Sequence, residues 1–199
     1  MTDEQTTEIA VEPLWTGQDM VDAMGARPLH GLPEAVTGIS IDSRTLQPGD
    51  AFFAIKGDRF DGHDFVGAAF EAGAAAALVS RVPAGLGADP ALLEVEDVLG
   101  GLRDIAVAAR ARTQATVLAV TGSVGKTGTK DSLAAALSVF GEVHASVGNL
   151  NNHIGAPLSL ARLPQTADYA VLELGMNHLG EISELTRLVR PDLTIITNV

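Results

Sequence analysis

The segment that most restricts the fold is glycine-rich and reads Thr121-Gly122-Ser123-Val124-Gly125-Lys126-Thr127. It directly follows an apolar run of strand length at 116–120, and it precedes a helical pattern that we expect over Lys130–Phe140, with Leu133 and Leu137 facing inward. A glycine loop between a strand and a helix is the context that a phosphate-binding loop requires. The glycines allow a tight turn, and the helix N-terminus adds a partial positive charge. The segment therefore predicts a phosphate loop inside an α/β domain.

The lysine and the hydroxyl of this loop would have distinct tasks. Lys126 would reach the β- and γ-phosphates of a nucleotide, and the Thr127 hydroxyl would ligate Mg²⁺. The general pattern has its first glycine at the position of Val120, so the loop here is shortened to G-x-x-G-K-T. A glycine-rich turn with a chance lysine is the alternative, but strand, helix and Gly-Lys-Thr triplet coincide.

Strands that alternate with helices predict an α/β fold in two parts. We expect a flexible tail at 1–12, a small N-terminal α/β domain at 13–95, a linker helix at 96–113 and a P-loop central domain at 114–199 with a mostly parallel sheet. The small domain has strands expected at 38–42, 51–55 and 75–80. The central sheet has only three expected strands, so we expect this domain to be truncated; they lie at 116–120, 169–174 and 193–197.

A carboxylate inside one of these apolar strands predicts a metal ligand. Ligands gather at the carboxyl ends of parallel strands, where the Gly122 loop, Glu173 and Thr197-Asn198 should converge. A buried carboxylate is costly unless it is paired or binds a cation, and Mg²⁺ prefers oxygen ligands. We therefore predict Mg²⁺ on Thr127 and Glu173, with Lys126 and Glu173 as the catalytic residues. The alternative is a glutamate on a solvent-facing edge or paired with a lysine.

Composition excludes several classes of function. The formal net charge of -12 argues against a nucleic-acid surface, which would be basic. The acidic N-terminus lacks the basic and apolar regions of a signal peptide, and no apolar run is long enough to span a bilayer. The absence of cysteine excludes disulfides and thiolate metal sites. We expect a cytoplasmic protein without nucleic-acid binding or membrane insertion.

The shortened loop resembles that of the Mur ligases, as do two further segments, Glu-Leu-Gly-Met-Asn-His at 173–178 and Asn-Asn-x-x-Gly-x-Pro-Leu at 151–158. The resemblance implies an ATP-dependent amide ligase of peptidoglycan precursor synthesis, which activates a carboxylate as an acyl phosphate. The last two segments resemble the member that adds D-alanyl-D-alanine to UDP-MurNAc-tripeptide. The implied cofactors are ATP and Mg²⁺, and the implied partners are these two substrates, bound by a monomer. The resemblance places ATP on Gly122, Ser123, Val124, Gly125, Lys126, Thr127 and Gly128. The alternatives are the neighbouring ligase that adds the third stem residue, a non-catalytic nucleotide- or UDP-sugar-binding module, and an unrelated P-loop NTPase. The first domain and the shortened loop argue against the last.

The resemblance also implies substrate-binding residues. Ile-Asp-Ser-Arg at 41–44 resembles the family's first domain, which holds the UDP end of the substrate, so Ser43 and Arg44 are candidates. The alternative is a local ion-pair network of Asp42, Arg44 and Asp50. The asparagine loop implies peptide contacts from Asn151 and Asn152, whereas turn chemistry is the alternative.

Two histidines are further candidates in the sequence. His178 is expected to bind substrate, with metal binding or helix capping left open, and His63 is expected to cap a helix. The family's remaining active-site residues would follow Val199, so we expect the 199-residue chain alone to be inactive.

Overall fold

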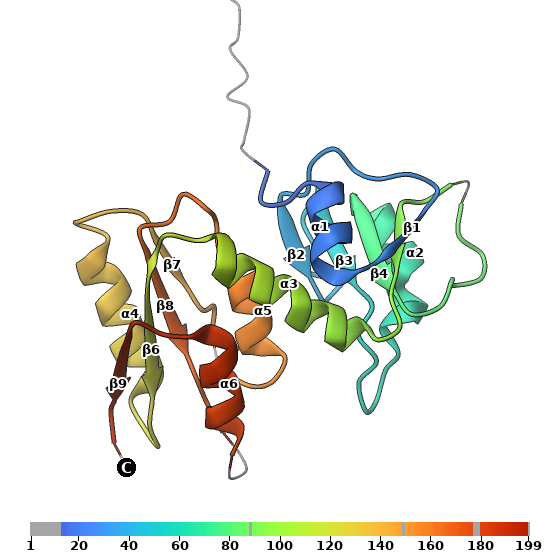
Figure 1. Ribbon diagram of the computed structural model, residues 1–199. Coiled ribbons are helices and arrows are strands. Elements are labelled where there is room, and N and C mark those ends of the chain that lie inside the picture. The colour runs from blue at the N-terminus through green and yellow to red at the C-terminus, as the bar shows by residue number, and fades with distance from the viewer. Residues whose placement is uncertain (1–12, 88, 149, 177–179, 199) are drawn as a thin grey trace, which may run out of the picture.

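The protein folds as two lobes, each built on its own sheet, with one long helix crossing between them (Figure 1). The computed structural model describes residues 13–87, 89–148, 150–176 and 180–198. The tail expected at 1–12 lies outside these residues. No helix in the described part of the chain is long and apolar enough to cross a membrane. The expected α/β class is confirmed.

The first lobe contains a five-stranded sheet of order β1-β5-β4-β3-β2, in which only β1 is antiparallel to its neighbour. The two faces bury different side chains: Phe53 and Leu78 pack toward α1 and α3, whereas Phe52 and Val79 pack toward α2. The elements are α1 (Gly17–Met24), β1 (Arg27–Leu29), β2 (Gly38–Ser40), β3 (Asp50–Phe53), the 3-10 helix η1 (Gly62–Phe65), α2 (Val66–Glu71), β4 (Ala76–Val79) and β5 (Leu92–Glu94).

The second lobe contains four parallel strands in the order β7-β8-β6-β9. Alternate residues of β6 face opposite layers: Val117 and Ala119 join the core under α3 and α5, and Leu118 and Val120 pack against α4. The elements are α3 (Val98–Arg112), β6 (Thr116–Thr121), α4 (Lys126–Leu137), β7 (Val143–Ala145), α5 (Gly155–Ala161), β8 (Tyr169–Glu173), α6 (Glu181–Val189) and β9 (Leu193–Ile196). The expectation of three strands was wrong, because β7 is a fourth.

Helix α3 belongs to both lobes. Its residues Leu102, Ile105, Ala106 and Ala109 are fully buried, as the sequence predicted for one face. They join one core that includes Phe53 of the first sheet and Leu172 of the second. The helix therefore supplies shared packing and not only a connection.

Several elements differ from the expected boundaries. Helix α4 begins at Lys126, four residues before the expected start, because the glycine loop leads directly into its first turn. The asparagine loop, residues 148–158, was expected to contain no helix, but its last four residues form the start of α5. Pro157 is compatible with that helix because it lies in the first turn, where a missing N–H is tolerated. Strands β1, β5 and β7, of three residues each, were missed; β2 is as short, but it was predicted from the longer alternating run 38–42.

Candidate functional site

The carboxyl ends of β6, β8 and β9 meet at one edge of the second sheet, as predicted. Val120 pairs with Glu173, and Thr121 pairs with Ile196. The Ser123 N–H donates to the Asn198 carbonyl at 3.0 Å, and the Thr197 hydroxyl donates to the Val124 carbonyl at 2.5 Å. The glycine loop is thus held against the end of β9 while its other side faces β8.

The conformation of this loop requires glycine at two positions. Gly122 has φ +135°, and a Cβ there would lie 2.3 Å from the Thr197 hydroxyl and 2.8 Å from the Asn198 carbonyl oxygen. Gly125 is the N-cap of α4 at φ +83°. Side chains strongly disfavour such backbone angles, so these glycines allow the turn. The turn places the N-terminus of α4, with its unpaired N–H groups, beside the loop.

Lys126 closes over the loop it follows. Its ammonium donates to the Gly122 carbonyl at 2.8 Å, and its side chain is half-buried. Lys126 also lines a cavity of about 490 Å³ together with Gly122, Ser123, Asn151, Asn152 and Met176. This volume lies within the range of small-molecule sites. The cation, the helix N-terminus and the cavity are therefore at one place, as an anionic ligand requires.

Glu173 is the buried acid of the site, 1% exposed. One carboxylate oxygen accepts from the Thr127 hydroxyl at 2.7 Å, and the other accepts from the Asn151 amide at 2.7 Å. Glu173 is therefore neither on a solvent-facing edge nor in an ion pair with lysine, which were the alternatives considered. The structure brings together the two side chains that the sequence assigned to a metal.

The chemistry of these two groups fits Mg²⁺. Both supply oxygen, and their atoms are close enough for one ion to replace the hydrogen bond between them. Among the described residues there is no cluster of three or more His, Cys, Asp or Glu suited to a metal. Water and phosphate oxygens commonly supply further ligands to Mg²⁺ at nucleotide sites.

The two candidate asparagines have different surroundings. The side-chain amide of Asn151 donates to Glu173, and the backbone carbonyl of Asn151 accepts a hydrogen bond from the Gly175 N–H at 2.8 Å. Asn152 accepts from the Ile154 and Gly155 N–H groups through its side chain, at 3.0 and 2.9 Å. Turn chemistry is thus realised at Asn152. Both residues line the cavity, and their contact with substrate stays a prediction; His178 lies outside the described residues.

A second cavity lies in the first lobe, where the sequence predicted substrate contacts. It measures about 470 Å³, and its lining combines the polar turn of Ser43 and Arg44 with the aromatic side chains of Phe60 and Phe65. Phe60 is 71% exposed and packs edge-on against Phe65 with 6.3 Å between the ring centroids. An aromatic wall beside a cationic turn can accept a flat, polar ring. Sequence reasoning missed the two phenylalanines, although they lie three residues before and two residues after His63.

Arg44 is paired within this turn. It donates to Asp42 through Nε at 2.9 Å and Nη2 at 2.6 Å, whereas Asp50 instead accepts from the Gln47 N–H. Two members of the ion-pair network considered above are therefore joined, and Asp50 is not part of it. The pair leaves Arg44 mostly exposed at the mouth of the cavity.

The Asp42–Arg44 pair predicts a measurable pKa. Hydrogen bonds from Arg44 lower the pKa of Asp42 from 3.8 to about 2. Because the folded-state pKa is depressed, the pair stabilises the turn above about pH 4 and this contribution is lost as the pH falls through 2. An NMR titration should give a pKa of about 2 for Asp42 and, in Arg44→Ala, a higher value that stays below 3.8, because the N–H of residue 44 still donates to the Asp42 carboxylate. Arg27→Ala removes an arginine that pairs with Glu94, and should leave the pKa of Asp42 unchanged. An unchanged value in Arg44→Ala would contradict this cause.

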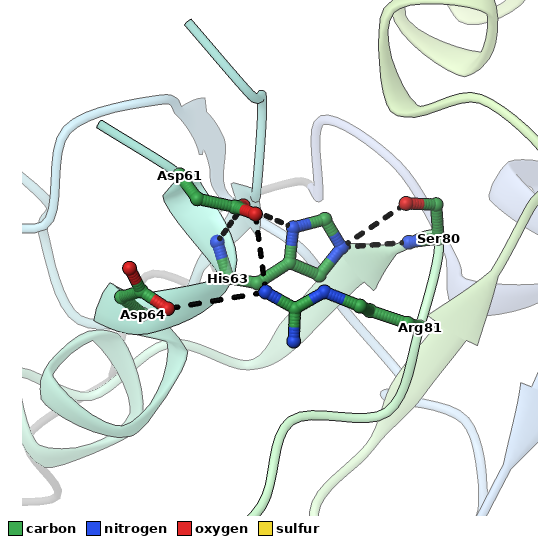
Figure 2. A network of polar contacts seen from close by, with 5 residues as sticks. All are labelled: Asp61, His63, Asp64, Ser80 and Arg81. Carbon is green, nitrogen blue, oxygen red and sulfur yellow. Dashed lines mark hydrogen bonds and ion pairs between the residues drawn. The ribbon is translucent and has the colours of Figure 1, made fainter. Parts of the chain in front are cut away.

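His63 does not cap a helix, contrary to expectation; Asp61 is the N-cap of η1. Figure 2 shows His63 between Asp61, at 2.6 Å from Nδ1, and Ser80, whose N–H donates to Nε2 at 2.9 Å. Since Nε2 accepts, Nδ1 carries the proton and donates to Asp61. The Ser80 hydroxyl lies 3.3 Å from Nε2, but the Nε2 lone pair is already engaged by the shorter bond from the Ser80 N–H, so the arrangement does not activate this hydroxyl. Hydrogen bonds from His63 hold the pKa of Asp61 well below its usual range. The network ties the segment that carries Phe60 and Phe65 to the end of β4.

Family models, curated sequences and solved structures all relate this chain to the Mur ligases. The chain matches "Mur ligase family, catalytic domain" over residues 35–110 and "Mur ligase middle domain" over residues 120–199. The UDP-N-acetylmuramoyl-tripeptide–D-alanyl-D-alanine ligase of Bacillus subtilis (strain 168) is 44% identical over 91% of this chain. The ligase of the same description from Escherichia coli (strain K12) is 43% identical over 86%. The chain spans 39% and 37% of these relatives, about two fifths of their length.

Solved structures agree with this. A crystal structure of MurF from Acinetobacter baumannii superposes with a TM-score of 0.78 at 38% identity, covering 92% of this chain and 40% of that one. MurF from Thermotoga maritima in complex with ADP superposes with a TM-score of 0.66 at 33% identity, covering 81% and 37%. Each superposition covers more of this chain than one lobe contains, so each includes residues from both lobes.

Proposed function

Because the chain belongs to the Mur ligase family, we propose that the full-length protein uses ATP to add D-alanyl-D-alanine to UDP-MurNAc-tripeptide, in the cytoplasm and as a monomer. The descriptions of the Bacillus subtilis and Escherichia coli relatives support this choice of substrates over the neighbouring ligase. The observation that carries the proposal is the contact of Thr127 with buried Glu173, directly beside the glycine loop and Lys126. This arrangement joins a place for phosphate to a place for its metal.

In the proposed complex, ATP lies along residues 122–128. The N–H groups at the start of α4 hold the phosphate oxygens, and Lys126 exchanges the Gly122 carbonyl for a β- or γ-phosphate oxygen. The Thermotoga maritima relative with ADP supports a nucleotide here. Positioning and electrostatics would provide most of the rate, as in other phosphoryl transfers.

Thr127 and Glu173 would hold Mg²⁺, which would neutralise charge on the phosphates when bound. Asn151 keeps the Glu173 carboxylate oriented by donating to its other oxygen. Thr127 is exposed, whereas Glu173 is buried. The pair therefore presents oxygen ligands from one side and leaves the opposite side to phosphate and water.

The first lobe would hold the UDP end of the substrate. We propose residues 13–95 as this domain, with residues 96–113 as the link and residues 114–199 as the ATP-binding domain. Its cavity offers Ser43 and Arg44 to the pyrophosphate or uracil oxygens, with Phe60 and Phe65 beside the ring. Asn151, Asn152 and His178 would contact the peptide end near the ATP.

The proposed reaction has two steps. The substrate carboxylate attacks the γ-phosphorus of ATP and the bond to the β-phosphate oxygen breaks, which gives an acyl phosphate and ADP. The D-alanyl-D-alanine amine then attacks the acyl carbon, phosphate leaves, and the amine proton passes to solvent. Lys126 assists the first step by balancing negative charge on the transferring group.

The direct test is phosphate release by the full-length protein with ATP and Mg²⁺. We expect release only when UDP-MurNAc-tripeptide and D-alanyl-D-alanine are both present. Release with UDP-MurNAc-dipeptide and diaminopimelate or lysine would instead identify the neighbouring ligase. No release with either pair, together with retained nucleotide binding, would identify a non-catalytic module.

A further inference from the structure

Helix α4 buries a lysine that the proposed reaction does not use. Lys130 is 3% exposed, and it is the only residue of α4 that is fully buried. It lies on the same face as the partly buried Leu133 and Leu137, where an apolar side chain would be ordinary. An ammonium in such a position is costly unless it is well paired. The contacts of the Lys130 ammonium therefore indicate the role of this residue.

The ammonium of Lys130 binds the end of β7. It donates to the Ser146 carbonyl at 2.6 Å and lies 3.0 Å from the carboxylate of Asp131, which is largely exposed. Ser146 is itself 2% exposed, and its N–H donates to the Val171 carbonyl of β8 at 3.1 Å. Lys130 thus fixes the backbone of the residue that follows β7.

Ser146 in turn holds the buried acid of the candidate site. Its hydroxyl accepts from the Glu173 N–H at 3.1 Å, and the Glu173 carboxylate accepts from Thr127, one turn before Lys130 on α4. These contacts close a ring that runs from Thr127 to Glu173, to Ser146, to Lys130 and back along the helix. Three elements, α4, β7 and β8, are therefore locked together at the point where the two proposed metal ligands meet.

We propose that Lys130, acting through Ser146, is a positioning residue that sets the separation of the Thr127 hydroxyl and the Glu173 carboxylate. This inference rests on the proposed function, because it assigns Lys130 to the metal-binding pair of that site. Lys130 does not touch the ligand. It holds the frame in which two side chains from different elements face each other before the metal arrives. Groups that orient metal ligands in this way affect metal affinity strongly.

The test measures how Mg²⁺ tightens the binding of fluorescent N-methylanthraniloyl-ADP to the full-length protein. In Lys130→Met, which keeps the apolar stem, we expect the Mg²⁺ concentration at half-effect to rise by about tenfold or more. Affinity for the nucleotide in EDTA should stay as in the parent, because residues 122–128 are untouched. Ser146→Ala keeps the carbonyl for Lys130 and removes the acceptor of the Glu173 N–H, so it should raise the half-effect concentration as well. The double variant should shift no further than Lys130→Met, since both substitutions break one ring.

Asp131→Asn is the matched control, because it removes the exposed partner of Lys130 and leaves the bond to Ser146. We expect an unchanged Mg²⁺ dependence in that variant. A parent-like Mg²⁺ dependence in Lys130→Met and Ser146→Ala, whatever their melting temperatures, would overturn the inference while leaving the proposed function intact. If Lys130→Met does not fold, Ser146→Ala decides alone. A parent protein that binds no nucleotide would overturn the proposed function and this inference together.

Discussion

Replacing Lys126 with alanine is expected to lower the rate of phosphate release by about 10³-fold, because a cation that balances charge on a transferring phosphoryl group has an effect of this order. In the structure its ammonium lies over the loop, 2.8 Å from the Gly122 carbonyl, and no other lysine lines that cavity among the described residues. The measurement is the rate with saturating UDP-MurNAc-tripeptide, D-alanyl-D-alanine and Mg²⁺.

The control for this variant is Arg187→Ala. It removes an equally charged, exposed side chain from α6 in the same lobe and should retain the parental rate. Without nucleotide, the Lys126→Ala variant and the parent should have the same melting temperature. The only hydrogen bond that the variant loses among those described, from Lys126 to the Gly122 carbonyl, is half-buried and contributes little to stability. A Lys126→Ala protein with more than about a tenth of the parental rate would contradict the role given to this residue.

Replacing Trp15 with alanine is expected to lower the free energy of unfolding by about 3–5 kcal/mol, the cost of removing a large buried aromatic side chain. Trp15 is 3% exposed, and its indole N–H donates to the Ala161 carbonyl at the end of α5, at 2.9 Å. The Arg112 guanidinium lies 3.3 Å from the ring centroid, and burial lowers the pKa of Arg112 to about 10. One side chain thereby joins the first lobe, α3 and the second lobe.

Chemical denaturation of the protein checks this value. Val107→Ala is the control because Val107 is on α3 but half-exposed, so its loss should change the free energy of unfolding little. Trp15→Phe keeps a ring against Arg112 and loses the hydrogen bond to Ala161. Its free energy of unfolding should therefore lie between those of Trp15→Ala and Val107→Ala. A Trp15→Ala protein as stable as Val107→Ala would show that the two lobes do not depend on this contact.

The sequence by itself determined the features that depend on local order. The loop at 121–127 was recognisable because its glycines, lysine and hydroxyl are consecutive and lie between an apolar strand and a helix. Glu173 was recognisable because a carboxylate inside an apolar strand must be paired. Parallel strands bring their carboxyl ends to one edge, so the convergence of β6, β8 and β9 also followed from the pattern.

Only the tertiary structure decided contacts between residues far apart in the chain. The three-residue strands β1, β5 and β7 form because neighbouring strands supply their hydrogen bonds, and three residues carry no periodicity of their own. Lys130 reaches Ser146 because α4 and β7 both pack against β8, and Asn151 reaches Glu173 from the loop between β7 and α5. The helical pattern predicted that Leu133 and Leu137 face inward, but it did not predict that Lys130 is buried beside them, and no local pattern names the acceptor of a buried ammonium. Local order thus determined which residues could bind phosphate and metal, and packing between distant segments decided which partners hold them in place.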